Sequence, residues 1–102
     1  MAINNTALTA TATSIYTSSG SSAITTIHLC NYTASTASAN IFAVPSGGTA
    51  GNSNVLYSNV QITAYNTLII YQEKFILDNG DKIYANCDAS NKITATVSSI
   101  GI

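Results

Sequence analysis

Three side chains of this sequence are suited to nucleophilic or metal chemistry: the single histidine, His28, and the two cysteines, Cys30 and Cys87. A thiolate nucleophile needs a base, a group that orients the base and an oxyanion site, and a metal needs several donors that converge on one point. His28 and Cys30 are two positions apart in a segment that alternates like a strand, and no orienting acid is apparent. We therefore expect a structural histidine, and no catalytic, metal-binding or cofactor-binding residue in a non-enzymatic protein.

A second group of polar side chains, Asp78, Asn79 and Asp81, offers the oxygen ligands that calcium prefers. The segment does not match an EF-hand loop and supplies only two carboxylates. Asn79-Gly80 is also the dipeptide that favours tight hairpin turns. The sequence therefore predicts a β-hairpin here, between residues 75–77 and 82–87, and not a cation site.

Charged residues are scarce, with three Lys or Arg and four Asp or Glu in 102 residues and a net charge of −1. Three lysines cannot form the basic face of a nucleic-acid-binding protein. A nearly neutral surface tends to self-associate unless another protein covers it, and a small domain with few large apolar residues often gains stability by assembly. We expect no nucleic-acid partner, and we expect a protein that is docked in its working state.

The N-terminal segment, residues 1–13, has neither a basic start nor a continuous apolar core, and no apolar run approaches the roughly 20 residues of a membrane span. We expect a soluble chain made in the cytoplasm, without a membrane partner. In that compartment two buried free thiols are the expected state of Cys30 and Cys87, with a single disulfide as the alternative.

Alternation of apolar and polar residues with a period of two recurs along the chain, whereas no window sustains the apolar spacing of a helix. Ile15 breaks the phase of the first strand and predicts a bulge or a bend, and residues 72–74 interrupt a later strand. The pattern predicts a single all-β domain over residues 1–102, an antiparallel β-sandwich of jelly-roll or immunoglobulin-like type with seven or eight short strands. The expected strands span residues 8–16, 23–32, 39–44, 55–64, 67–71, 75–77, 82–87 and 92–100.

The longest predicted loop, PSGGTAGNSN over residues 45–54, contains three glycines and no large apolar side chain. It is a candidate contact loop, with an ordinary connection as the alternative. The six tyrosines leave a further possibility open, because an exposed tyrosine such as Tyr57 or Tyr65 can stack on a sugar or a protein partner.

Two segments, PSGGTAGNSNVLYSN and KFILDNGDKIYANCDASNKITATVSSIGI, resemble parts of small proteins of tailed bacteriophage virions, including marine and cyanobacterial phages. The shared ending consists of strand and turn residues, here Leu77, Gly80, Asp81, Ile83, Ala85 and residues 94–102. The resemblance implies a β-sandwich virion protein, in capsid decoration or in the neck, tail or baseplate. It implies no catalytic residues.

The leading prediction is a capsid decoration, or cement, protein of the virion that binds the major capsid protein and stabilises the shell. It is expected to form a homo-oligomer, with a trimer as the working assumption. The alternatives are a neck, tail or baseplate accessory protein and, from another class, a carbohydrate-binding module. Residues 1–6 and 98–102 are expected as extended contact arms, and the expected contact residues are Pro45, Ser46, Gly47, Gly48, Thr49, Ala50, Gly51, Asn52, Ile3 and Ile102.

Overall fold

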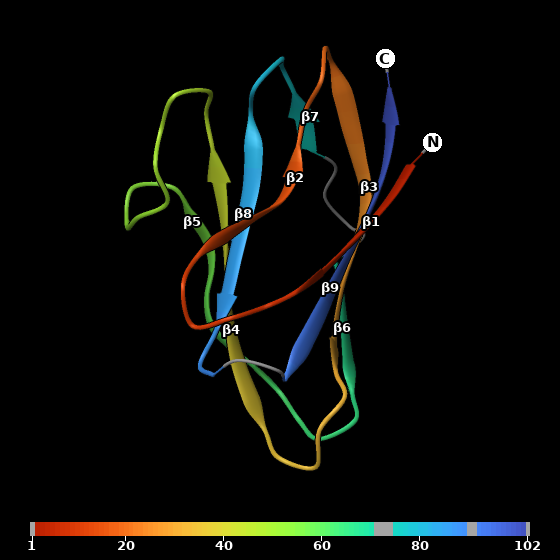
Figure 1. Ribbon diagram of the computed structural model, residues 1–102, viewed down its shortest axis with the longest axis vertical. Coiled ribbons are helices and arrows are strands. Elements are labelled where there is room, and N and C mark those ends of the chain that lie inside the picture. Colours follow the sequence, from red (N-terminus) through yellow and green to blue (C-terminus); the bar gives the residue numbers. More distant parts are fainter. Residues whose placement is uncertain (1, 71–74, 90–91, 102) are drawn as a thin grey trace.

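The computed structural model describes residues 2–70, 75–89 and 92–101, and every regular element in these ranges is a β-strand. The strands form two antiparallel sheets that lie side by side in Figure 1. The all-β sandwich predicted from the sequence is confirmed. The strands are β1 (Ala2–Ala7), β2 (Thr13–Thr17), β3 (Ser22–Asn31), β4 (Ala37–Val44), β5 (Val55–Ile62), β6 (Thr67–Ile70), β7 (Phe75–Leu77), β8 (Lys82–Cys87) and β9 (Ile93–Gly101).

Sheet A has the strand order β1-β9-β3-β6, with β7 also paired to β3, and sheet B has the order β2-β8-β4-β5. The pairs are nested: β1 with β9, β2 with β8, β3 with β6 and β7, and β4 with β5. One long hairpin wrapped into two sheets has this pairing, which is the jelly-roll order. Of the two topologies left open by the sequence, the jelly roll fits and the immunoglobulin order does not.

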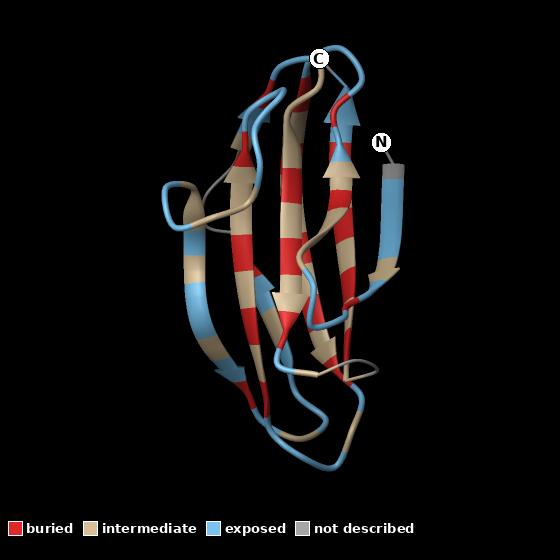
Figure 2. Ribbon diagram, turned by 60° about the vertical axis from the view of Figure 1, so that its left-hand side comes forward, coloured by how far each residue is buried: buried red, intermediate tan, exposed pale blue. Residues whose placement is uncertain are grey.

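The core lies between the sheets and is built from the inward positions of alternating strands (Figure 2). In β8, for example, Ile83, Ala85 and Cys87 are buried while the residues between them are half-buried. The largest fully buried side chains are aliphatic except for one, Asn31. The aromatic residues Tyr16, Tyr57 and Phe75 are partly buried and pack against the margin of the core. The core is therefore made of small and medium aliphatic side chains.

The first expected strand, residues 8–16, is wrong in its boundaries. Leu8 is buried and still donates its N–H to Ile93 O, at 2.9 Å, but the chain then leaves sheet A and enters sheet B at Thr13. Threonine and alanine alternate through this crossing, so the local pattern resembles a strand although residues 9–12 belong to no strand. The predicted bulge is confirmed, because the register of β2 against β8 shifts between Ser14 and Tyr16.

The described residues of the segments expected as extended arms, 2–6 and 98–101, are part of sheet A. Residues 2–7 form β1, the strand that raises the count to nine, and residues 98–101 belong to β9, which pairs with both β1 and β3. The interruption expected at residues 72–74 lies outside the described residues.

The hairpin predicted at residues 78–81 is also wrong, because β7 belongs to sheet A and β8 to sheet B. The turn itself exists: Asp81 N–H donates to Asp78 O at 3.1 Å, and Gly80 has φ of +88°. A single positive φ at the third residue is typical of a type II turn, whereas the hairpin turn favoured by Asn-Gly needs two. The turn therefore carries the chain from one sheet to the other.

Candidate docking surface

The outer face of sheet A is formed by the residues that alternate with its core positions. In β3, Ile27 and Leu29 are buried, so His28 and Cys30 lie on the outer face. In β9, Thr94, Thr96 and Ser98 alternate in the same way with buried residues. The rest of this face is supplied by the outward residues of β1, β6 and β7.

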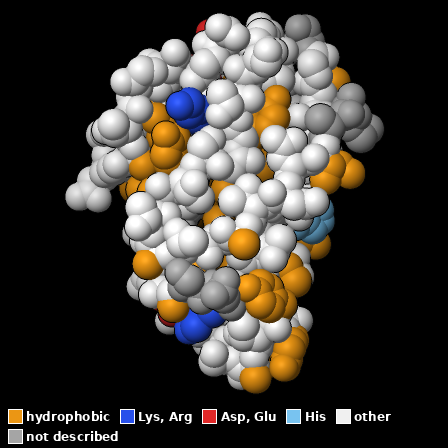
Figure 3. Space-filling view, in the orientation of Figure 1, with side chains coloured by type: hydrophobic (Ala, Val, Ile, Leu, Met, Phe, Trp, Pro, Cys, Tyr) orange, Lys and Arg blue, Asp and Glu red, His pale blue; other side chains and the backbone are white. Residues whose placement is uncertain are grey.

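Among the described residues, seven large hydrophobic side chains are exposed, and six of them belong to this face or its lower end. They are Ile3, Tyr32, Tyr65, Ile69, Ile76 and Ile100, and the exception is Leu56 on β5. Ile76 and Ile100 flank Ala23, which pairs with both of them across three neighbouring strands. Figure 3 shows hydrophobic side chains along the edge of the molecule where sheet A lies.

The strands of sheet A contain no Asp, Glu, Lys or Arg. Three charged residues directly adjoin these strands in the sequence: Lys74 before β7, Asp78 after it and Lys92 before β9. Lys92 is paired with Asp88 at an Nζ to Oδ2 distance of 3.6 Å. A partner that covers these strands therefore need not strip water from a charged side chain of the strands themselves, and removing water from a charge is costly.

Two tyrosines extend the face at its lower end. The register of β3 against β6 runs from Ile27–Ile70 to Cys30–Thr67, and Asn31 N–H donates to Asn66 O at 2.9 Å, which continues it. Tyr32 and Tyr65 therefore occupy the next opposed position. Tyr32 is 45% exposed and Tyr65 is 71% exposed.

The outer face of sheet B differs in chemistry. Asn40 Nδ2 donates to Asn86 Oδ1 at 3.0 Å, and Asn86 Nδ2 donates to Ala10 O at 3.1 Å. Asn40 Oδ1 also accepts the N–H of Asn59 at 2.7 Å. The amide groups of Asn40 and Asn86 are thus hydrogen-bonded within the chain, and they do not require a partner protein to satisfy them.

The predicted contact loop, residues 45–54, connects β4 and β5 and is largely exposed: residues 45–49 and 52 are exposed, and Ala50 and Gly51 are half-buried. Asn54 fixes it, because its Oδ1 accepts the Gly51 N–H at 3.0 Å and its Nδ2 donates to Thr49 O at 2.8 Å. Asp81 Oδ1 accepts the Ser46 N–H at 2.9 Å at its beginning. The loop is thus a preformed surface.

The structure does not bring the predicted contact residues together. The loop projects beside sheet B, whereas Ile3 lies in β1 at the far edge of sheet A (Figure 1). Ile102, the last expected contact, lies outside the described residues. The exposed isoleucines Ile69, Ile76 and Ile100 were not singled out from the sequence. Alternation could have placed only Ile100 outside, because β6 and β7 have apolar residues on both faces.

The chemically reactive side chains are dispersed. Cys30 and Cys87 are both free, as expected, but Cys30 is half-buried on the outer face of sheet A and only Cys87 is buried. Burial raises the pKa of the Cys87 thiol above its ordinary value, although Sγ donates to Ala89 O at 2.6 Å. In the described part of the chain, no three His, Cys, Asp or Glu side chains gather as metal ligands would.

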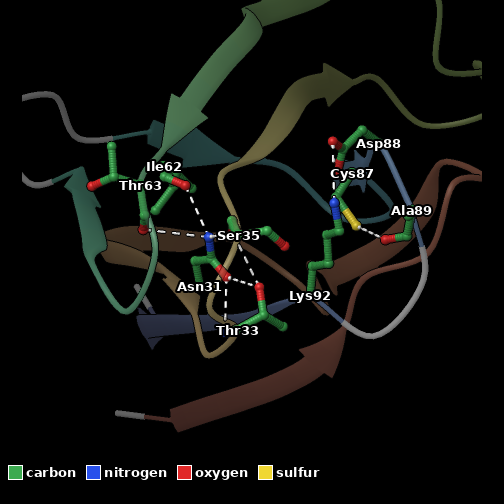
Figure 4. Close-up of polar contacts among 9 residues, drawn as sticks. All are labelled: Asn31, Thr33, Ser35, Ile62, Thr63, Cys87, Asp88, Ala89 and Lys92. Carbon is green, nitrogen blue, oxygen red and sulfur yellow. Dashed lines mark hydrogen bonds and ion pairs between the residues drawn. The ribbon is translucent and has the colours of Figure 1, made fainter.

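Asn31 is a buried polar residue that the sequence analysis missed (Figure 4). It occupies a core position at the end of β3, in phase with Ile27 and Leu29. Its Nδ2 donates to Ser35 O at 2.8 Å and Ile62 O at 2.9 Å, and its Oδ1 accepts from the Thr33 N–H and hydroxyl. The side chain therefore ties β3 to two connections that cross between the sheets.

Among residues 2–70, 75–89 and 92–101 there is no helix long and apolar enough to cross a membrane. Comparisons of the chain with family models, with curated proteins and with solved structures found no match.

Proposed function

We propose that this protein is a non-enzymatic structural protein of a phage virion, a capsid decoration protein that binds the shell of major capsid protein through the outer face of sheet A. The observation that carries the proposal is that six of the seven large hydrophobic side chains exposed among the described residues lie on one side of the molecule, over strands without a charged residue. Monomeric proteins rarely expose such patches unless a partner covers them.

The size of the face supports docking onto another protein. The molecule measures 39 × 26 × 20 Å, and the two sheets stand side by side in the view down its shortest axis (Figure 1). The two longest strands of sheet A, β3 and β9, have ten and nine residues, or about 30 to 33 Å, and four neighbouring strands cover about 19 Å. The outer face therefore covers about 600 Å², a large part of the roughly 800 Å² that each partner buries in a standard protein interface.

The shell would be stabilised by thermodynamic linkage between binding of this protein and assembly of the shell. A protein that binds only the assembled shell adds its binding free energy to that state and opposes disassembly.

The experiment is binding of the purified protein to shells assembled from the major capsid protein of the same virus, measured by co-sedimentation. We expect saturable binding that Ile69→Lys and Ile76→Lys abolish. Leu56→Lys, on sheet B, is the matched control and should bind as the unaltered chain does. Equal binding by all three variants would contradict the role of sheet A. If the protein ignores shells and is imaged on the neck or tail of the particle, the accessory role replaces decoration.

A carbohydrate-binding module is the second candidate, and Tyr65 favours it. Its φ of +60° is unusual for a residue with a bulky side chain, and the ring is 71% exposed, beside Tyr32. Backbone strain of this kind concentrates at functional sites. Calorimetric titration with oligosaccharides tests the idea: heat of binding that Tyr65→Ala removes and Tyr57→Ala retains would support it, and absence of binding to any of them would exclude it.

A further inference from the structure

The four edges of the sandwich are not equally protected against pairing with another chain. Exposed strand edges are usually blunted by bulges, shortness, proline or charge. β2 has a register shift at Ser14–Tyr16, and β5 has two shifts and a positive φ at Asn59. β6 and β7 have four and three residues. These features protect three of the four edges.

β1 has none of these features. Its six residues, AINNTA, contain no proline and no charge, and they pair with β9 from Ala2–Ser99 to Ala7–Thr94 without a shift. The order of sheet A leaves the other edge of β1 without a described strand. An open cleft of about 370 Å³ separates it from β2, lined by residues 3–6 and 14–17. There is therefore room beside β1 for an incoming strand.

The hydrogen bond from Leu8 N–H to Ile93 O continues the register of β1 against β9. In an antiparallel ladder the residues that bond to one neighbour alternate with those that face the other side. Even-numbered residues of β1 therefore bond to β9. Ile3, Asn5 and Ala7 direct their backbone N–H and C=O groups to the free edge.

We propose that β1 pairs with β1 of a second copy of this chain, antiparallel and about a two-fold axis at Asn5. The odd-numbered residues of both copies must face each other, because only they present free hydrogen-bonding groups. A register centred on Asn5 joins Ile3 to Ala7 of the second copy, Asn5 to its counterpart and Ala7 to Ile3, whereas a register centred on Asn4 joins only two such pairs. Centring on Asn5 thus makes the most hydrogen bonds.

A second copy fits this edge better than an unrelated strand for two reasons. The edge is its own complement under a two-fold axis, which is the commonest symmetry of protein dimers, and it carries no charge that would repel its copy. A two-fold axis perpendicular to sheet A also turns both outer faces in the same direction, so the dimer offers one continuous uncharged face. The assembly is then a dimer and not the trimer assumed from the sequence.

The test is sedimentation equilibrium combined with site-directed cross-linking in a Cys30→Ser background. We expect a dimer for the unaltered chain. Opposed residues of a ladder lie within reach of a disulfide. Asn5→Cys should therefore form an intermolecular disulfide on oxidation, and Asn4→Cys should not. A monomer at millimolar concentration, or cross-linking by Asn4→Cys in preference to Asn5→Cys, would overturn the proposal.

Asn5→Pro provides an independent variant that should still fold, since the N–H it removes faces the free edge and edge strands tolerate proline. Losing one such bond from each copy should raise the dimer dissociation constant about thirtyfold. An unchanged constant in a folded variant would refute the pairing. Dimerisation is measured here without shells, so its failure leaves shell binding untouched, and the failure of shell binding leaves the dimer untouched.

Discussion

Asn31 holds Thr33 by two hydrogen bonds to one oxygen: its Oδ1 accepts the backbone N–H of Thr33 at 3.0 Å and the hydroxyl at 2.8 Å. The same side chain donates to two carbonyl groups through Nδ2, Ser35 O and Ile62 O. A fully buried asparagine with every polar atom satisfied fixes the place where the chain passes from sheet A to sheet B.

Asn31→Ala is expected to destabilise the fold by about 3 kcal/mol, because it leaves buried partners without hydrogen bonds. Thr33→Val removes the hydroxyl hydrogen bonds to Asn31 Oδ1 and Ser35 O but keeps the backbone N–H bond to Asn31, and it should cost about 1 kcal/mol. Urea unfolding followed by circular dichroism measures both. Equal effects of the two variants would show that the amide is not the centre of this network.

Gly80 lies against Ser46, and its replacement should be costly. A Cβ built on Gly80 would lie 2.6 Å from Ser46 Oγ, and the φ of +88° strains any side chain. Gly80→Ala should therefore lower the free energy of unfolding by about 2 kcal/mol. Gly47→Ala is the matched control, because φ is +82° and no atom lies within 4 Å of the added carbon. It should cost about 1 kcal/mol, from the backbone conformation alone, and an equal loss in both would contradict the steric contribution of Ser46.

The architecture could be predicted from the sequence because alternation identifies strands that have one buried face. β3, β8 and β9 show this pattern in their sequences and again in their burial. The partners of a strand are less predictable. Asn79-Gly80 predicts a turn correctly, but whether the next strand returns beside the last one or joins the other sheet depends on contacts such as Asp81 with Ser46, which are distant in sequence.

The candidate surface was harder to predict than the fold. Alternation in β9 shows that Ile100 is out of phase with the core, but β6 is apolar on both faces and gives no such sign for Ile69. No local pattern can show that Ile100 shares one face with Ile3 and Ile76, since that depends on sheet order. The free edge of β1 depends likewise on the pairing of the first strand with the last. The loop at residues 45–54 was recognisable because its composition is local.

Tyr65 is expected to be replaceable with a gain in stability. Its φ of +60° is disfavoured for a bulky side chain, and the exposed ring contributes little burial. Tyr65→Asn should therefore stabilise the protein by about 0.5 to 1 kcal/mol, because asparagine tolerates this region. Tyr32→Asn is the control, since Tyr32 has no such positive φ, and it should give no gain. Thermal unfolding decides: a loss of stability in Tyr65→Asn would show that the ring makes contacts that stabilise the fold.

The buried thiol of Cys87 is expected to make the folded protein less stable in alkaline solution. Burial raises the pKa of its thiol in the folded chain above the ordinary value. The folded state therefore keeps its proton where the unfolded state releases it, and stability is full below about pH 8.5 and declines as the pH rises through the raised pKa. Urea unfolding between pH 7 and pH 10 should show that the free energy of unfolding falls more steeply with pH for the unaltered chain than for Cys87→Ala. Cys30→Ala, at the half-buried thiol on sheet A, should keep the steeper decline. Parallel profiles for all three chains would show that the Cys87 thiol titrates alike in the folded and unfolded states.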